Sequence, residues 1–377
     1  MFPLGVDIGG TTVAAAVWRR GRAEQALLAA RRPGRDTVLP LLGTAAPVLV
    51  RGVPRAPVEL AADLLREVLD AVPASGRVAL TYPDGWAGHR RAALLDAARR
   101  AGITVTEPLL LSTAAAAALH LAGPLPAGEL VTVCHLGGTS CTVTPLRGTG
   151  AVPEPAGPPR RIPAGGEDID QLLFSYVVSA GRADELSARS ERRELRSAMA
   201  AAREGLTGEE AVTVRLPGAH RDVEVTRAVL DDLVRTLLAP VSDALSAVAT
   251  PVLLTGGLAR MPAVAAVLSA GLGRPVTPAS AEHAQAAALG AARAAAGLDP
   301  PGWAPFVPAE PVPAPPPAPA PVPAPAVVAP VRAVVAPDDV VTVHTGATTT
   351  GVRGRVTAVL VIAGVLLVLA LAVAFGR

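Results

Sequence analysis

Apolar residues along the first 298 positions form two kinds of pattern, short continuous runs and longer runs with helical period. The short runs predict strands over residues 4–8, 13–18, 77–82, 129–134 and 141–146, a short strand near Ile103 and a hairpin over 212–225. Helical periodicity covers residues 57–72, 89–101, 113–121, 191–206, 226–248 and 282–296. Residues 19–56 carry no pattern that predicts an element. Strands that alternate with helices in this way indicate the α/β class.

One turn sequence occurs twice. Residues 6–13 read VDIGGTTV and residues 134–141 read CHLGGTSC, so in both an apolar run meets Gly-Gly, two hydroxyl residues and a second β-prone run. This order predicts a strand, a tight turn and a strand, and we expect the turn glycines to adopt positive φ. A third Gly-Gly, Gly256-Gly257, follows an apolar run and opens toward a helix that begins near Pro262. A single turn of this kind is ordinary turn chemistry, whereas three of them indicate a phosphate-binding cleft between duplicated halves.

Composition narrows the possible chemistry. Half of the 377 residues are apolar but aromatics make up only 2%, so we expect a core of Ala, Val and Leu. All 34 basic residues are Arg, and the absence of Lys excludes a Walker A loop. Cys134 and Cys141 are too few for a disulfide framework, and we expect free thiols in a small core rather than a metal pair or redox switch. Asp84 is interpreted as a turn residue rather than a catalytic base.

The composition changes abruptly near Asp299. Proline alternates with Ala and Val from 300 to 337, a pattern that favours polyproline II over a packed core. Residues 356–375 are apolar and uncharged, and about 20 helical residues span a bilayer core. We therefore expect a domain over 1–298, a disordered Pro/Ala-rich linker over 299–355 and a transmembrane helix over 356–375, although a buried core helix is the alternative. Arg353 and Arg355 favour a cytoplasmic domain on a single-pass protein of the cell membrane.

The order of these motifs resembles the nucleotide-binding domain of the Hsp70 chaperones, within the actin-like ATPase superfamily, in an actinobacterial-type form with a C-terminal anchor. Residues 7–12 (DIGGTT) are similar to the family's first phosphate motif, and residues 135–140 (HLGGTS) to its second. Residues 165–170 (GGEDID) resemble the family's Gly-Gly-Glu-Asp-Phe-Asp. Residues 255–262 (TGGLARMP) resemble the adenosine motif, and 288–292 (ALGAA) the closing helix.

The resemblance implies a duplicated actin-like ATPase fold of two lobes, with mixed sheets flanked by helices, followed by the linker and the membrane helix. It also implies ATP or ADP as ligand, with Mg²⁺ held through water by Asp7. Asp7 and His135 stand at the catalytic positions. The residues implied to bind nucleotide are Gly9, Gly10, Thr11, Thr12, Gly137, Gly138, Thr139, Ser140, Gly165, Gly166, Glu167, Arg203, Thr207, Gly256, Gly257 and Arg260.

The chain departs from the family where hydrolysis is carried out. His135 replaces the Asp that helps to place hydrated magnesium, and imidazole is a poor substitute for a hard oxygen ligand. The catalytic Lys and the Thr at the Gly10 position are missing, and Leu111 stands where the family has the Glu of Glu-Pro-Thr. Glu167 and Asp168 are either cleft residues or residues that cap a helix. Binding is therefore expected to be better preserved than hydrolysis.

Three functions remain open. The first is a membrane-anchored Hsp70-like ATP-binding protein, a chaperone-type or regulatory ATPase with weak hydrolysis and a protein client or partner. The second is a catalytically inactive scaffold that recruits a partner at the membrane. The third is a sugar kinase of the same superfamily, which lacks support because no catalytic Asp or zinc-binding Cys cluster of that class is recognisable. We expect no nucleic-acid partner.

Overall fold

The computed structural model describes residues 2–30, 39–50, 52–72, 76–103, 108–181, 189–216, 221–276 and 281–297. All of them belong to the first of the two units into which the chain divides, residues 1–340 and 341–377. The expected linker (299–355) and membrane helix (356–375) lie outside the described residues. Within the described ranges, no helix is both long and apolar enough to cross a membrane.

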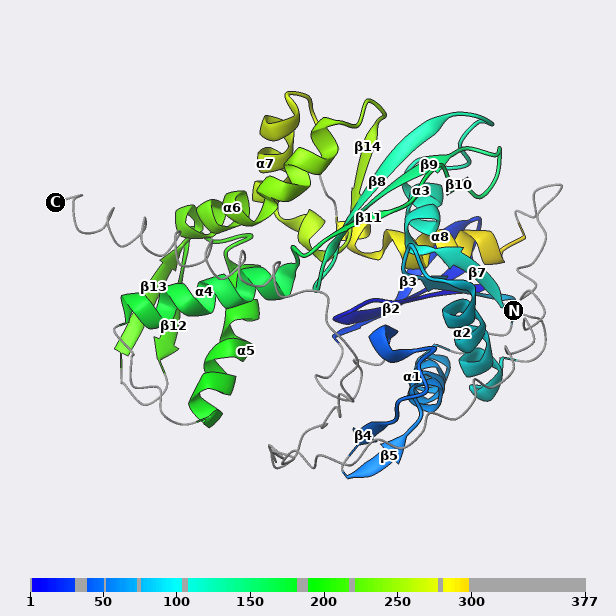
Figure 1. Ribbon diagram of the computed structural model, residues 1–377, viewed down its shortest axis with the longest axis horizontal. Helices are drawn as coiled ribbons and strands as arrows, with labels where there is room; N and C mark the ends of the chain where they lie inside the picture. The colour runs from blue at the N-terminus through cyan, green and yellow to red at the C-terminus, as the bar shows by residue number, and fades with distance from the viewer. Residues whose placement is uncertain are drawn as a thin grey trace, which may run out of the picture. The chain divides into compact units, whose positions relative to one another are not determined.

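The first half of the chain builds a five-stranded sheet. Its strands are β1 (Leu4–Ile8), β2 (Thr12–Arg19), β3 (Arg22–Ala30), β6 (Val78–Tyr82) and β7 (Leu109–Ser112), in the order β3-β2-β1-β6-β7. Strand β1 pairs antiparallel with β2 and parallel with β6. Helices α1 (Pro57–Ala71) and α2 (Gly88–Arg100) accompany this sheet (Figure 1). The Leu and Val positions of the periodic run in α1 are buried, as its pattern predicts.

The second half repeats the pairing of the first. Its sheet has the order β10-β9-β8-β14, with β11 also paired to β9. The strands are β8 (Leu130–Leu136), β9 (Cys141–Arg147), β10 (Glu154–Pro155), β11 (Arg160–Ile162) and β14 (Val252–Thr255). Strand β8 pairs antiparallel with β9 and parallel with β14, just as β1 pairs with β2 and β6. The repeated pairing supports the predicted duplication and fits the actin-like ATPase fold.

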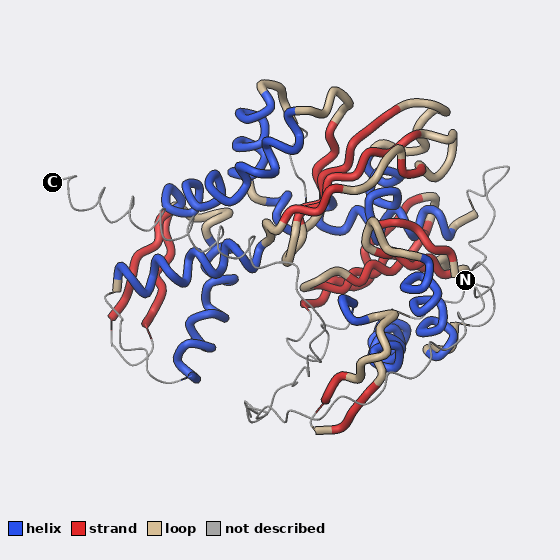
Figure 2. The backbone as a smooth tube through the Cα atoms, in the orientation of Figure 1, coloured by secondary structure: helices blue, strands red, loops and turns tan. Residues whose placement is uncertain are grey.

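The remaining elements of the second half surround its sheet or extend from it (Figure 2). Helices α4 (Gly166–Ala180), α5 (Arg189–Gly205) and α6 (Arg227–Ser246) lie between β11 and β14 in sequence, with the hairpin β12 (Ala211–Leu216) and β13 (Arg221–Thr226) among them. Thr226 caps α6, because its side chain accepts a hydrogen bond from the Val229 amide. After β14 come the 3₁₀ turn η2 (Gly257–Arg260) and α7 (Pro262–Leu272).

Two alanine-rich helices, α3 (Thr113–Leu121) and α8 (Ala286–Ala295), pack against each other, and α8 also packs against β1 (Figure 1). A methyl group at Gly290 would lie 2.6 Å from the carbonyl carbon of Ala116 and would overlap its oxygen. A methyl group at Gly5 would lie 2.7 Å from the carbonyl carbon of Ala291. Backbone therefore meets backbone at both places, and small residues are required there.

Two expected elements differ from the structure. Residue 103 is not in a strand; the strand of this region is β7, at Leu109–Ser112, because it is this run that continues the parallel sheet beside β6. The helix expected over 282–296 begins with the 3₁₀ turn η3 (Ala281–Gln285) and becomes α-helical as α8. Residues 19–56, which showed no pattern, contain β3, the 3₁₀ turn η1 (Leu39–Leu41) and a small hairpin, β4 (Val48–Val50) with β5 (Val53–Arg55).

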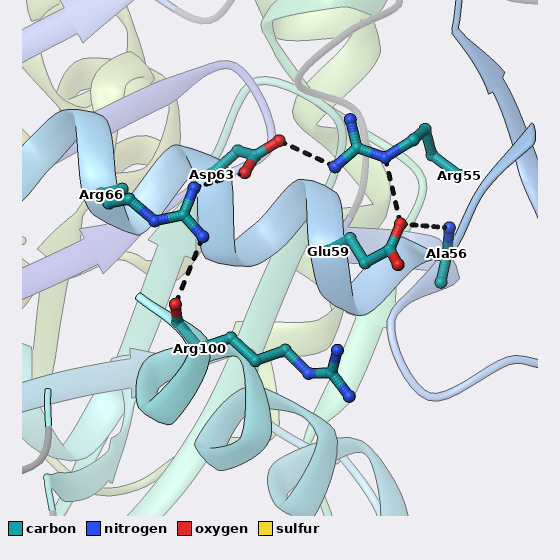
Figure 3. A network of polar contacts seen from close by, with 6 residues as sticks. All are labelled: Arg55, Ala56, Glu59, Asp63, Arg66 and Arg100. Carbon is teal, nitrogen blue, oxygen red and sulfur yellow. Dashed lines mark hydrogen bonds and ion pairs between the residues drawn. The ribbon is translucent and has the colours of Figure 1, made fainter. Parts of the chain in front are cut away.

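Charged side chains fix the start of α1 (Figure 3). Glu59 accepts hydrogen bonds from the Ala56 amide at 3.2 Å and from Arg55 Nε at 3.0 Å, and Arg55 also pairs with Asp63 at 3.0 Å. The hydrogen bond from Arg55 lowers the pKa of Glu59. These pairs are partly exposed, so each stabilises the helix only slightly, and their main effect is to cap a helix whose N-cap residue is alanine.

Gly290→Ala should lower the free energy of unfolding by at least about 2 kcal/mol, because the added methyl group must push α8 away from α3. The effect opposes helix propensity, which alone favours alanine by about 1 kcal/mol. Gly88→Ala is the matched control, since a Cβ at this helical position meets nothing within 4 Å. Denaturant unfolding followed by circular dichroism measures both variants, and equal stability of the two would contradict the close packing of α3 and α8.

Candidate functional site

A cavity of about 200 Å³ lies where the three glycine turns meet. Strands β1, β8 and β14 each end at it, followed by the turns at Gly9-Gly10, Gly137-Gly138 and Gly256-Gly257. The expected residues that line the cavity are Asp7, Gly9, Gly10, Thr11, Thr12, His135, Gly137, Gly138, Gly166, Arg203, Thr207, Gly256, Gly257 and Arg260. Residues from both halves of the chain thus share one site.

The first two turns contact each other in a reciprocal way. A methyl group at Gly10 would lie 2.9 Å from Oγ1 of Thr139, and one at Gly138 would lie 2.9 Å from Cβ of Thr11. The two contacts are equivalent in the internal duplication, because Gly10 corresponds to Gly138 and Thr11 to Thr139. The expectation of positive φ at these glycines is wrong: none of the four turn glycines has it. Close approach of the opposite turn, and not backbone strain, is what requires glycine at Gly10 and Gly138.

The third turn separates a structural glycine from one that faces open space. Gly256 has φ +95° and a methyl group there would lie 2.7 Å from the carbonyl carbon of Leu136, so only glycine fits. Its amide donates to the carbonyl of His283 at 3.1 Å. Gly257 lines the cavity, and a Cβ built there meets nothing within 4 Å.

The N-terminus of α4 supports the second turn. The amide of Gly166 donates to the Gly137 carbonyl at 3.1 Å, and the amide of Glu167 donates to the Gly138 carbonyl at 2.8 Å. Asp168 accepts from the Gly165 amide at 2.8 Å, which settles its role as a capping residue. A methyl group at Gly165 would lie 2.5 Å from the Gly138 carbonyl oxygen. These amide groups therefore hold the turn in place.

Four of the expected binding residues do not line the cavity, namely Thr139, Ser140, Gly165 and Glu167. Thr139 and Gly165 instead pack against the neighbouring turn, where they shape its backbone. The cavity also includes four residues that the sequence did not indicate, Glu204, Leu258, Met261 and Ala284. Glu204 follows Arg203 on α5. Because Arg203 was expected in the site, its neighbour in the sequence could have been expected there as well.

Charged side chains occupy the part of the cavity formed by α5 and η2. Arg203 Nε lies 2.7 Å from Oδ1 of Asp170, and the two side chains are only 14% and 20% exposed. A half-buried pair of this kind holds the guanidinium in one orientation. Glu204 and Arg260 both line the cavity, and neither forms an ion pair with another residue in the described part of the chain.

Two desolvated carboxylates, Asp7 and Asp84, lie at or just after the ends of neighbouring strands of the first sheet, and Asp7 lines the cavity. Asp7, the residue before the last of β1, accepts a short hydrogen bond from the Thr81 hydroxyl. Burial raises its pKa, while this bond and His135 act against the rise. Asp84, in the turn after β6, accepts from the amide of Ala114 at 3.1 Å, and burial raises its pKa as well. Asp84 is therefore a turn residue, as expected, but it also caps α3 beside the site, a role that the sequence did not reveal.

The residues present fit a polyphosphate and, less directly, a magnesium ion. Backbone amides of glycine turns bind phosphate without obstruction from side chains. Within the described ranges, no group of three or more His, Cys, Asp and Glu side chains is placed to hold a metal. Asp7 lines the cavity and is the carboxylate that would hold a magnesium ion through its waters, as this ion prefers.

Comparison with known proteins gives the family. The family described as Hsp70 protein matches residues 55–303, well over half of the chain. The chain belongs to the Hsp70 family. The match begins after the first glycine turn, so residues 9–12 lie outside it, whereas the second and third turns lie within it.

Relatives of this Hsp70-family chain include proteins named chaperone protein HscA homolog. The one from Pseudomonas putida is 30% identical over 295 residues, which cover 72% of this chain and 45% of the relative. The one from Pseudomonas aeruginosa (strain LESB58) is 34% identical over 192 residues, which cover 49% of this chain and 30% of the relative. The chain thus spans less than half the length of the relatives it matches.

The two cysteines of this Hsp70-family chain lie next to the second turn. Cys134 and Cys141 are fully buried free thiols, with their sulfur atoms 3.5 Å apart. The hydrogen bond between them, together with burial, raises the pKa of Cys134 well above its usual value. This placement supports the expected small-core role, because a protonated buried thiol reacts slowly.

In the native protein neither thiol should react with 5,5′-dithiobis(2-nitrobenzoate), and both should react after unfolding in guanidinium chloride. The reason is that the reagent needs an accessible thiolate, which burial disfavours. Absorbance of the released thionitrobenzoate counts the thiols in each state. Rapid reaction of the folded protein, or fewer than two thiols after unfolding under non-reducing conditions, would contradict this assignment.

Proposed function

We propose that this Hsp70-family chain binds ATP or ADP in the cavity between its two halves. The observation that carries the proposal is the convergence of three glycine turns on one cavity that Arg203, Thr207 and Arg260 also line. The turns present backbone amides to the phosphates, and Arg260 stacks on the base. Asp170 positions Arg203 through their ion pair, next to the nucleoside.

The activity that follows is chaperone-type or regulatory and depends on slow ATP hydrolysis. The names of the HscA homologues support a chaperone-type role. Magnesium, when bound, neutralises charge on the phosphates, and Asp7 orients its waters. His135 lines the cavity where a second oxygen ligand would assist, so turnover is expected to be slow. A protein client or partner is expected for this function.

A scaffold that binds nucleotide without turnover is the second candidate. It is favoured by the same observation, that His135 and not a carboxylate stands beside Asp7 in the cavity. In that case nucleotide holds the two halves together while another surface recruits a partner at the membrane. Single-turnover hydrolysis distinguishes the candidates, because the scaffold binds ATP and returns it unchanged.

Gly257→Val should abolish nucleotide binding while leaving the fold intact. Its side chain enters the cavity and meets no protein atom at Cβ, so it fills space that the ligand needs. Isothermal titration with ADP measures the effect, and Gly88→Val is the control outside the cavity. Arg260→Ala should weaken binding by roughly 1–2 kcal/mol, or about tenfold, through loss of stacking. Unchanged affinity in the Gly257 variant would place the nucleotide elsewhere.

We further propose that residues 356–375 anchor the protein in the cell membrane with the nucleotide domain in the cytoplasm. The support is the uncharged apolar run preceded by Arg353 and Arg355.

Full-length protein should sediment with membranes and resist carbonate extraction, whereas truncation before Val356 should release it. Val365→Arg is a control that keeps the full-length chain. It should also release the protein, since a charge at the centre of the helix costs about 2.5–3.5 kcal/mol in membrane insertion. Protease added to spheroplasts should leave the nucleotide domain uncut. Cleavage of that domain from outside would reverse the orientation, and a soluble full-length protein would refute the anchor.

A further inference from the structure

A groove of about 410 Å³ runs between helix α5 and strand β12, and it shares no lining residue with the cavity at the glycine turns. Its volume is within the range of roughly 300–1,000 Å³ that ligand sites occupy. Four consecutive residues of β12, 212–215, line it. Side chains alternate between the two faces of a strand, so a wall made of four consecutive residues is an edge of the strand and not one of its faces.

The edge of β12 that borders the groove carries unpaired backbone groups. Among the described residues β12 pairs only with β13, so its other edge is free. The amide of Arg227 donates to the carbonyl of Glu210 at 2.8 Å in the register of the hairpin, which makes these two residues a hydrogen-bonded pair. Such pairs occur at every second residue of an antiparallel ladder. The even-numbered residues of β12 therefore bond to β13, whereas Thr213 and Arg215 direct their N–H and C=O groups away from it, toward the groove.

The opposite wall of the groove is formed by small residues of α5. Ala198, Ala201 and Gly205 line it, and their spacing of three and four residues places them on one face of the helix. A strand added to a sheet lies about 4.8 Å from its neighbour. With no side chain longer than a methyl group at these three positions, α5 leaves room for the backbone of such a strand beside β12. The groove therefore fits an extended peptide, whose backbone groups can bond to the free edge.

Carboxylates surround this groove. Glu194 and Glu209 line it and are exposed, and neither forms an ion pair within the described ranges. Arg215 is the one basic residue among the described residues that line it, and Asp222 lies opposite Arg215 in the hairpin, with Glu224 two residues further along the same face. Four carboxylates beside one guanidinium favour a basic ligand. They also oppose pairing of this edge with the same edge of a second copy.

We propose that the groove between α5 and β12 binds an extended, basic segment of a partner protein, which adds to β12 as a third strand. The segment accepts hydrogen bonds from the amides of Thr213 and Arg215 and donates to their carbonyls. Its Lys or Arg side chains lie near Glu194 and Glu209, and its side chains toward α5 are small. The groove is separate from the nucleotide cavity, so peptide binding and nucleotide binding are tested independently.

The first test measures peptide binding to full-length protein without nucleotide, by fluorescence anisotropy. The probe is the labelled heptapeptide KVTVAVK, and the controls are EVTVAVE and a copy of the probe with its three central amides N-methylated. The probe should bind, and both controls should bind at least about tenfold more weakly. Affinity for the probe should fall as salt rises, because salt screens exposed charges. Absence of probe binding, or equal binding of either control, would overturn the proposal.

The second test locates the peptide with variants. Thr213→Pro removes one outward amide and no bond to β13, since a proline is tolerated on the free side of an edge strand. Ala201→Leu fills the groove from α5 with another good helix former. Each should weaken probe binding at least about tenfold, whereas Ser197→Leu, exposed on the same helix outside the groove, should not change it. Unchanged affinity in a folded Ala201→Leu variant would refute the site, even if Thr213→Pro does not fold, and ADP affinity should be unchanged in that variant.

The third test identifies the backbone groups that bind. Hydrogen exchange resolved to single amides should slow most at Thr213 and Arg215 when the probe is added. Protection confined to other parts of the chain would contradict strand addition. Light scattering of the protein without peptide should give no dimer through this edge. A dimer that Thr213→Pro abolishes would assign the edge to a second copy and overturn the proposal.

Discussion

Direct contact between the backbones of the two halves is the constraint on which the rest of this structure depends. It occurs where α8 meets α3 and β1, at Gly290 and Gly5. Where the first two glycine turns meet, the close contact is instead between Gly10 or Gly138 and a threonine side chain of the opposite turn. At each place a single methyl group would lie closer than atoms normally approach. The two halves can share one cavity only if they pack at this short distance. These contacts therefore determine the shape of the site.

The duplication explains why the contact between the turns is reciprocal. Each half ends its first strand in the same turn, and each turn places a threonine against the glycine of the other. A two-fold relationship of this kind makes one favourable contact count twice, as in symmetric dimers. The third turn is not part of the repeat. It contributes Gly257, which lines the cavity without a side chain that would fill it.

Binding and chemistry depend on different kinds of residue in this Hsp70-family chain. Binding depends on backbone amides, which any sequence supplies once glycine permits the approach, so the loss of particular side chains leaves it intact. Chemistry depends on side chains that move protons or orient water, and there the resemblance implies that the chain departs from the family at His135 and Leu111. Asp7 nevertheless places an acidic group in the cavity, at a cost in desolvation. Such a cost is typical of functional sites.

Much of the architecture was determined by the sequence alone, because it depends on local chemistry. Periodic apolar residues predict α1 and α3 to within about a residue, and the hydroxyl of Thr226 and the ring of Pro262 mark the helix starts at α6 and α7. The strand β7 was missed because its short apolar run has no alternation, and its pairing with β6 is long-range.

The function of individual glycines, by contrast, was decided by tertiary structure. Sequence suggests positive φ at the first two Gly-Gly turns, yet only Gly256, in the third turn, has it. Gly10 and Gly138 are glycine because a threonine side chain of the opposite turn lies beside each of them. Asp84 likewise reads as an ordinary turn residue until α3 is placed next to it. The physical reason is the same in both cases: φ preferences and caps act within a few residues, whereas close approach and burial arise only when distant segments pack together.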